Sequence, residues 1–124
     1  MTGPVFDALN FTSTLTRKRI SNAWVNYRSF KKTLKTKSPI HPGLPASIAI
    51  EPTTSCNLRC PECPSGLRSF SRPTDMLQEE TYKKIIDELY TKLSYLILYF
   101  QGEPYLHPQI LNLVKYANEK KVYC

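Results

Sequence analysis

The segment Cys56-Asn57-Leu58-Arg59-Cys60-Pro61-Glu62-Cys63 places three thiols within eight residues, at a C-x₃-C-x₂-C spacing. It follows the run Ser47–Glu51, which is short, rich in β-branched residues and stopped by Pro52, and which therefore predicts a strand. Thiolates that lie this close along a chain can converge on one metal centre. We therefore expect a metal-binding loop at the C-terminal end of the first strand.

The cysteine spacing narrows the kinds of centre that fit. A structural zinc site normally adds a second pair of ligands to the first, and a ferredoxin-type cluster needs four cysteines. The fourth cysteine of this chain is Cys124. Two alternatives stay open: a zinc-binding structural module that adds His41, His107 or Cys124, and an electron-transfer cluster that uses Cys124. Three thiolates on a four-iron cluster would leave one iron free to bind another group.

Composition and charge divide the chain into two parts. With 124 residues, 41% hydrophobic and 22% charged, it has the size of one globular domain. Residues 1–50 hold eight Lys or Arg and one acid, whereas residues 51–124 hold nine of each. We predict a basic helix with a proline-rich linker over residues 1–45 and an α/β domain over residues 46–124.

The location of the chain is predicted from what the sequence lacks. Its longest apolar run, Tyr95–Phe100, is far shorter than the ~20 residues that span a bilayer. The N-terminus has no apolar segment typical of a secretory signal. Three cysteines crowded into one loop fit a reducing compartment better than paired disulfides. We therefore expect a cytoplasmic protein without a transmembrane span.

Residues 14–36 predict a basic amphipathic helix. Its apolar residues recur near the helical period, and they are Ile20, Ala23, Trp24, Tyr27, Phe30 and Leu34. We expect this helix to pack under the domain with its lysines in water. The alternative is that the stripe lies on an anionic membrane surface or contacts nucleic acid. The prolines of residues 37–45 then predict an extended linker, in which His41 is structural or faces solvent.

The remaining chain predicts a β-α-β-α-β order. The expected elements are strand 47–51, helix 78–90, strand 95–100, helix 108–118 and strand 122–124. This order implies parallel strands with right-handed crossovers. In parallel α/β folds, ligands bind at the C-terminal ends of the strands. The cysteine loop and the turn Gln101-Gly102-Glu103-Pro104, which follows the second strand, should therefore face the same mouth.

Together these two motifs resemble the radical S-adenosylmethionine superfamily. Residues 46–124 are similar to the beginning of the partial (β/α)₆ TIM-like barrel of that family, and the turn at Gly102 resembles its Gly-Gly-Glu-Pro motif with Gln101 in place of the first glycine. The segment Glu51–Pro64 resembles the peptide- and protein-modifying branch that carries a C-terminal SPASM domain. The residue before the last cysteine is usually aromatic in the family, and here it is Glu62.

The resemblance implies a set of ligands and partners. Cys56, Cys60 and Cys63 would hold a [4Fe–4S] cluster whose open iron binds S-adenosylmethionine, which the reduced cluster cleaves to a 5′-deoxyadenosyl radical. Gly102, Glu103 and Pro104 would contact the methionine part of the cofactor, and the backbone of Glu62 would lie near its adenine. A reductant protein of the flavodoxin or ferredoxin type and a peptide substrate are the implied partners. No residue is assigned as a catalytic acid or base.

The small number of predicted strands indicates that this chain does not form a complete barrel. Three parallel strands, the third only three residues long, cannot close a barrel, and they leave an apolar edge uncovered. An open site would also expose a radical to solvent. We therefore expect either a fragment of a longer enzyme or half of an enzyme that a second chain completes. In both cases the chain alone should bind a cluster poorly and lack multiple turnover.

Overall fold

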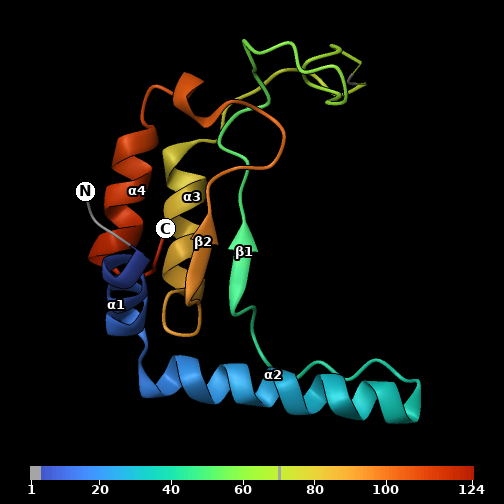
Figure 1. The fold of residues 1–124 in the computed structure, drawn as a ribbon, viewed down its shortest axis with the longest axis vertical. Coiled ribbons are helices and arrows are strands. Elements are labelled where there is room, and N and C mark those ends of the chain that lie inside the picture. The colour runs from blue at the N-terminus through green and yellow to red at the C-terminus, as the bar shows by residue number, and fades with distance from the viewer. Residues whose placement is uncertain (1–3, 70) are drawn as a thin grey trace.

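The computed structural model describes residues 4–69 and 71–124, with side chains from Asp7 onward. Residues 1–3 of the predicted N-terminal part and residue 70 of the segment after the cysteines lie outside this description. The elements are α1 (Pro4–Thr14), α2 (Arg17–Thr36), β1 (Ser47–Ala49), α3 (Glu79–Leu89), β2 (Tyr95–Ile97), the 3₁₀ turn η1 (Pro104–Leu106) and α4 (Ile110–Glu119). Figure 1 shows α2 lying across one end of the molecule and the cysteine loop at the other.

The strands β1 and β2 are parallel, with Ser47 opposite Tyr95 and Ala49 opposite Ile97. The predicted third strand is present only as a parallel bridge between Tyr123 and Tyr95. The structure shows β1, α3, β2 and α4 in the predicted order, with Tyr123 beside β2, and the third strand stays a prediction. A complete barrel stays a prediction.

Both strands are shorter than the sequence predicts. The last rung joins the amide of Ile50 to the carbonyl of Ile97 at 2.8 Å. Beyond it, the amides of Gln101 and Gly102 donate to the side chain of Glu51 instead of to a strand. Backbone pairing between the two segments therefore ends at Ile50 and Ile97, and beyond it the side chain of Glu51 joins them.

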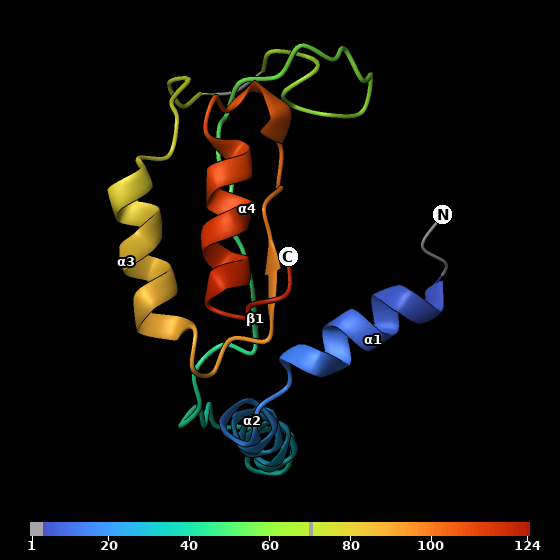
Figure 2. The same ribbon diagram turned by 90° about the vertical axis from the view of Figure 1, so that its left-hand side faces the viewer.

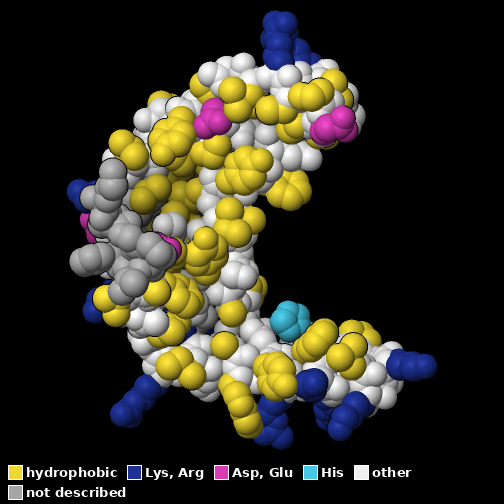
Figure 3. All heavy atoms as spheres, viewed as in Figure 1, with side chains coloured by type: hydrophobic (Ala, Val, Ile, Leu, Met, Phe, Trp, Pro, Cys, Tyr) yellow, Lys and Arg dark blue, Asp and Glu magenta, His cyan; other side chains and the backbone are white. Residues whose placement is uncertain are grey.

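The core lies between one face of the sheet and the helices α3 and α4, which cover that face (Figure 2). Its buried residues are Tyr82, Ile86, Leu93, Leu96, Leu113, Ala117 and Val122. The buried hydroxyl of Tyr82 donates to the carbonyl of Leu113 at 2.8 Å, so this polar group is satisfied. On the other face, the side chains of Tyr95 and Ile97 are exposed. Figure 3 shows hydrophobic side chains along the concave side between the cysteine loop and α2.

The N-terminal region contains two helices instead of the single predicted one. The first, α1, ends at Thr14, and the hydroxyl of Thr16 caps α2 by accepting a bond from the amide of Arg19 at 3.3 Å. Phe11 of α1 makes edge contacts with the rings of Tyr95 and Tyr123, at centroid distances of 6.4 and 5.5 Å. Tyr95 is the first residue of β2, and Tyr123 is paired with it in a parallel bridge. Aromatic contacts therefore hold α1 against the open face of the sheet.

The helix α2 lies under the domain with its lysines exposed, but its apolar stripe is not the face that contacts the domain. The helix docks through polar residues instead: Arg19 is 2% exposed, and its guanidinium donates to the carbonyls of Tyr90, Lys120 and Lys121. These carbonyls belong to the chain at the ends of α3 and α4, where helices leave acceptors unpaired. The predicted stripe faces solvent, as do the lysines. No helix within the described residues combines the length and the apolar content that crossing a bilayer requires.

Candidate metal and cofactor site

The cysteine loop, residues 56–63, follows β1 at the end of the sheet where both strands end (Figure 1). All three thiols are free; Cys60 is exposed, and Cys56 and Cys63 are partly so. The amide of Cys63 donates to the carbonyl of Cys60 at 3.2 Å, which makes a turn of the last part of the loop. The predicted ligands therefore share one accessible loop.

The environment of Cys63 favours its thiolate. Hydrogen bonds from the backbone amides of Gly66 and Ser65 lower the pKa of this thiol, because they stabilise the negative sulfur. Gly66 also lies against the loop so closely that a Cβ there would be 2.4 Å from the carbonyl oxygen of Cys60. The buried hydroxyl of Ser65 donates to the carbonyl of Gln101 at 2.7 Å. The loop is thus tied to the turn that follows β2.

The three sulfur atoms do not form a ready-made metal centre. Among the residues that the structure describes, no three His, Cys, Asp or Glu side chains are grouped so that they could hold a metal ion. The cysteine loop contains neither helix nor strand. Binding a cluster would therefore require the loop to draw Cys56, Cys60 and Cys63 together, and their role as ligands stays a prediction.

The Gly102 turn lies directly against the chain that leads into the cysteine loop. The amide of Glu103 donates to the carbonyl of Ser55 at 2.8 Å. Gly102 is buried, and a Cβ at this position would lie 1.8 Å from the carbonyl oxygen of Thr53. Only glycine permits this approach. The prediction that the two motifs meet at the same end of the sheet is confirmed.

The other predicted cofactor residues have contacts of their own. A carboxylate oxygen of Glu103 accepts a bond from the amide of Tyr105 at 3.2 Å, and this bond caps η1, which begins at Pro104. Glu62 is exposed in the cysteine loop. The cofactor contacts of these residues stay predictions.

The sequence analysis missed Glu51. One of its oxygens accepts bonds from the amides of Gln101 at 3.2 Å and Gly102 at 3.1 Å, and the other pairs with Arg72 at 2.7 Å. This carboxylate therefore joins the end of β1, the segment after the cysteines and the turn after β2. The available signal was an acidic residue at the end of an apolar strand, directly before Pro52.

The structure gives the zinc alternative no fourth ligand from the residues considered for it. His107 is buried; its Nε2 donates to the carbonyl of Leu77 at 3.0 Å while its Nδ1 accepts from the amide of Gln109 at 3.2 Å. His41 lies in the linker beside α2, at the opposite end of the molecule (Figure 1). Cys124 follows Tyr123, which pairs with the first residue of β2 and so lies at the far end of the sheet from the cysteine loop. The electron-transfer alternative loses Cys124 for the same reason.

Comparison with known proteins gives two similar relatives. Both are named PqqA peptide cyclase, one from Bradyrhizobium diazoefficiens and one from Rhodopseudomonas palustris. Each is 30% identical to this chain over 82 residues, which is 65% of this chain and 21% of the relative. The match therefore spans only about a fifth of the length of these curated relatives. No family model matches the chain, and no solved structure matches it.

Proposed function

We propose that this chain is the cluster- and cofactor-binding part of a radical S-adenosylmethionine enzyme that modifies a peptide. One observation carries the proposal: the cysteine loop and the Gly102 turn come from successive β-α units, and Ser55 and Ser65, which flank the cysteine loop, are bonded to that turn. Unrelated loops have no reason to combine three clustered thiols with a Gly-Glu-Pro turn whose glycine is buried. The similarity to proteins named peptide cyclase supports the substrate class.

The donor set fits an iron–sulfur cluster. Thiolates are the usual ligands of such clusters, and three thiols in an accessible loop would leave one iron open. Cys56, Cys60 and Cys63 are the residues that would hold it, and Cys63 is the one already inclined to the thiolate. When bound and reduced, a [4Fe–4S] cluster supplies the electron that cleaves S-adenosylmethionine to a 5′-deoxyadenosyl radical.

The chain itself would prepare the cofactor site. Glu51 holds two successive amides of the turn after β2, and Gly102 fixes the distance of that turn from Thr53. A turn that is ordered before binding loses little entropy when a ligand arrives. In this proposal Gly102, Glu103 and Pro104 would contact the methionine part of the cofactor, and the backbone of Glu62 would contact its adenine once the cysteine loop closes.

The sheet supports the barrel assignment. One face is covered by α3 and α4, and the other carries exposed apolar side chains, as the inner wall of a β/α barrel would before further strands are added. Further strands, from the same polypeptide or from a second chain, would complete the barrel over this inner face. The proposed partners are a reductant of the flavodoxin or ferredoxin type and a peptide, in the cytoplasm.

Anaerobic reconstitution with iron and sulfide tests the proposal. We expect a brown product with the broad absorbance of a [4Fe–4S] cluster, and we expect its loss when Cys56, Cys60 and Cys63 are changed to Ala. Cys124→Ser is the matched control and should retain the iron, because this thiol lies away from the loop. A colourless product that binds stoichiometric zinc would overturn the proposal, and loss of iron in Cys124→Ser would favour the electron-transfer alternative.

Formation of 5′-deoxyadenosine under anaerobic reduction is the second measurement. We expect the 124-residue chain to form at most about one equivalent, because the inner face of its sheet is open to water. Many equivalents from a monomeric chain would contradict this expectation. Turnover that appears only with a co-expressed partner would identify a second chain as the source of the missing wall.

A further inference from the structure

The helix α2 carries an apolar stripe that is more than half exposed and that no described residue covers. The stripe consists of Ile20, Trp24, Tyr27, Phe30 and Leu34, and each of these side chains is between 57% and 60% exposed. Single exposed apolar residues are ordinary, but a continuous row of five large ones marks an interaction surface. The helix is already attached to the domain by Arg19 and Asn22 on another face. The apolar stripe is therefore free for a partner.

Positive charge runs beside the apolar stripe. Between Asp7 and Glu51 the chain has no acidic residue and eight Lys or Arg. The guanidinium of Arg28 lies 4.6 Å from the centre of the Trp24 ring, and the ammonium of Lys31 lies 5.7 Å from that of Tyr27. Figure 3 shows basic and hydrophobic side chains together along the arm that α2 forms. A partner that covers the stripe must therefore also accept these cations.

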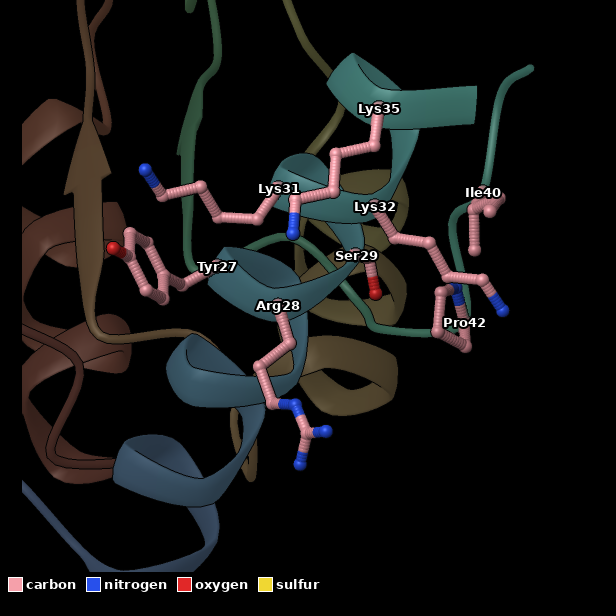
Figure 4. A pocket seen from close by; sticks show the side chains of 8 residues that line it. All are labelled: Tyr27, Arg28, Ser29, Lys31, Lys32, Lys35, Ile40 and Pro42. Atoms are coloured by element: carbon pink, nitrogen blue, oxygen red, sulfur yellow. The ribbon is translucent and has the colours of Figure 1, made fainter. Parts of the chain in front are cut away.

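A groove on α2 is lined by several of these cations. It has a volume of about 490 Å³ and runs beside the returning linker. Its basic lining residues are Arg28, Lys31, Lys32 and Lys35, and the rest are Tyr27, Ser29, Ile40 and Pro42 (Figure 4). No carboxylate lines the groove. Figure 4 shows the four cationic side chains extending in different directions around the helix, so they spread positive charge along it without an opposing carboxylate in the groove.

We propose that α2 is an interfacial helix that lies on an anionic phospholipid bilayer, with the apolar stripe among the upper parts of the acyl chains and the cations at the phosphates. A helix with aromatic residues on one face and Lys and Arg beside them has the composition of such segments. Anionic lipids attract each nearby Lys or Arg, and the apolar residues add burial. A bilayer offers both kinds of contact over a long surface.

Charge complementarity decides between the bilayer and other occupants. A second copy of the chain would cover the apolar stripe, but it would bring two rows of cations together with no acid on either helix. A nucleic acid would neutralise the cations, but its backbone would leave five large apolar side chains in water. Of these three occupants, the bilayer satisfies both features.

The fluorescence of Trp24 provides a specific test, because this is the only tryptophan of the chain. The 124-residue chain is titrated with vesicles of phosphatidylcholine and phosphatidylglycerol, and separately with phosphatidylcholine alone. We expect a blue shift with the anionic vesicles, fading as salt is added, and little or no shift with the neutral ones. This test requires no cluster or cofactor, so its result is independent of the proposed enzymatic function.

Substitutions in α2 separate the contribution of positive charge to membrane binding from that of apolar burial. Changing Lys31, Lys32 and Lys35 to Gln should weaken binding on the order of 100-fold, since each cation near an anionic surface contributes about fivefold. Phe30→Ser with Leu34→Ser should weaken it through lost burial. The matched controls lie on other helices: Lys84→Gln with Lys115→Gln, and Leu111→Ser, whose side chain is 71% exposed on α4. Both controls should bind as the parent chain does.

Four outcomes would overturn the proposal. The first is no blue shift with anionic vesicles, and the second is an equal shift with neutral vesicles. The third is a response of Trp24 to a mixed-sequence oligonucleotide that exceeds its response to the anionic vesicles. The fourth is a blue shift without lipid that rises with protein concentration and accompanies a dimer in size-exclusion chromatography. Circular dichroism of each variant confirms that α2 is still helical.

Discussion

The carboxylate of Glu51 accepts a hydrogen bond at 3.1 Å from the backbone amide of Gly102, a residue 51 positions further along the chain. The same oxygen accepts a bond from the amide of Gln101, and the other oxygen pairs with Arg72. The side chain of Glu51 is only 13% exposed, so water competes little for these amides. The relative position of the two proposed binding motifs thus depends on a residue that belongs to neither.

Replacing Glu51 should reveal this dependence. Glu51→Ala leaves the amides of Gln101 and Gly102 without their acceptor, and we expect it to reduce the free energy of unfolding by about 1–3 kcal/mol. Glu51→Gln keeps an oxygen acceptor and loses only the ion pair with a partly exposed Arg72, so it should cost less, about 1 kcal/mol or below. Urea denaturation followed by circular dichroism measures both. Equal losses in the two variants would show that the amide bonds do not stabilise the fold.

Gly102→Ala should destabilise the chain more than the same change at Gly43. A Cβ at Gly102 would meet the carbonyl oxygen of Thr53 at 1.8 Å, so backbone has to move, at a cost of about 1–3 kcal/mol. A Cβ at Gly43 would meet the Oδ1 atom of Asn26 at 1.9 Å, and that side chain can turn away. Thermal unfolding of the two variants provides the comparison. A larger loss at Gly43 would contradict the structure of the turn.

Arg19 should contribute more to stability than its neighbour Arg17. Arg19→Met removes the donors for the carbonyls of Tyr90, Lys120 and Lys121, and we expect a loss of about 1.5–3 kcal/mol. Arg17→Met, at an exposed position of the same helix, should change stability by less than about 0.5 kcal/mol. Urea unfolding measures the difference, and faster amide exchange at the first turns of α2 in Arg19→Met would confirm the role in docking. Similar stabilities of the two variants would contradict it.

We expect Asp87 to make the free energy of unfolding depend on pH. Hydrogen bonds from Lys120 and Tyr116 lower the pKa of this carboxyl below its ordinary value in the folded chain. A lowered pKa stabilises the fold above the pKa of the unfolded chain, and this stabilisation is lost as the pH falls through the folded pKa. Asp87→Asn should therefore be less stable than the parent at neutral pH and equal to it in strong acid. Unfolding measured across this range checks the sign.

The control for this prediction is Glu88→Gln, which removes the neighbouring exposed carboxylate of α3. It changes the net charge by the same amount and leaves the ion pair between Asp87 and Lys120 intact. A pH dependence that flattens equally in both variants would assign the effect to overall charge instead of to Asp87.

Local patterns were enough to predict the elements of the domain and their order. Tyr82 and Ile86 recur at helical spacing on α3, and both lie in the core as the pattern indicates. Contacts between residues that are distant in sequence were not predicted. The burial of α2 is decided by Arg19, whose acceptors at Tyr90 and Lys120 lie 71 and 101 residues away. A hydrophobic period contains no information about such acceptors, so it could not indicate that α2 contacts the domain through Arg19.

The candidate site was likewise predicted in part: the meeting of the two motifs was expected, and the contacts that depend on distant residues were not. That the two motifs meet follows from the rule that parallel strands end at one edge, and the bond between Ser65 and Gln101 bears it out. Glu51 was missed because its importance comes from amides that lie 50 and 51 residues further on. The helix α1 was missed because Phe11 finds its aromatic partners on β2 and at Tyr123.

The aromatic contact of α1 has a consequence for access to the inner face of the sheet. The rings of Tyr95 and Tyr123 stack at 5.5 Å, and Phe11 lies against both, at the end where β2 begins. These three rings cover the end of this face that lies away from the cysteine loop. Ile97, at the end of β2 nearer the loop, is 41% exposed on the same face. The open apolar surface of the sheet therefore lies on the side of the thiols.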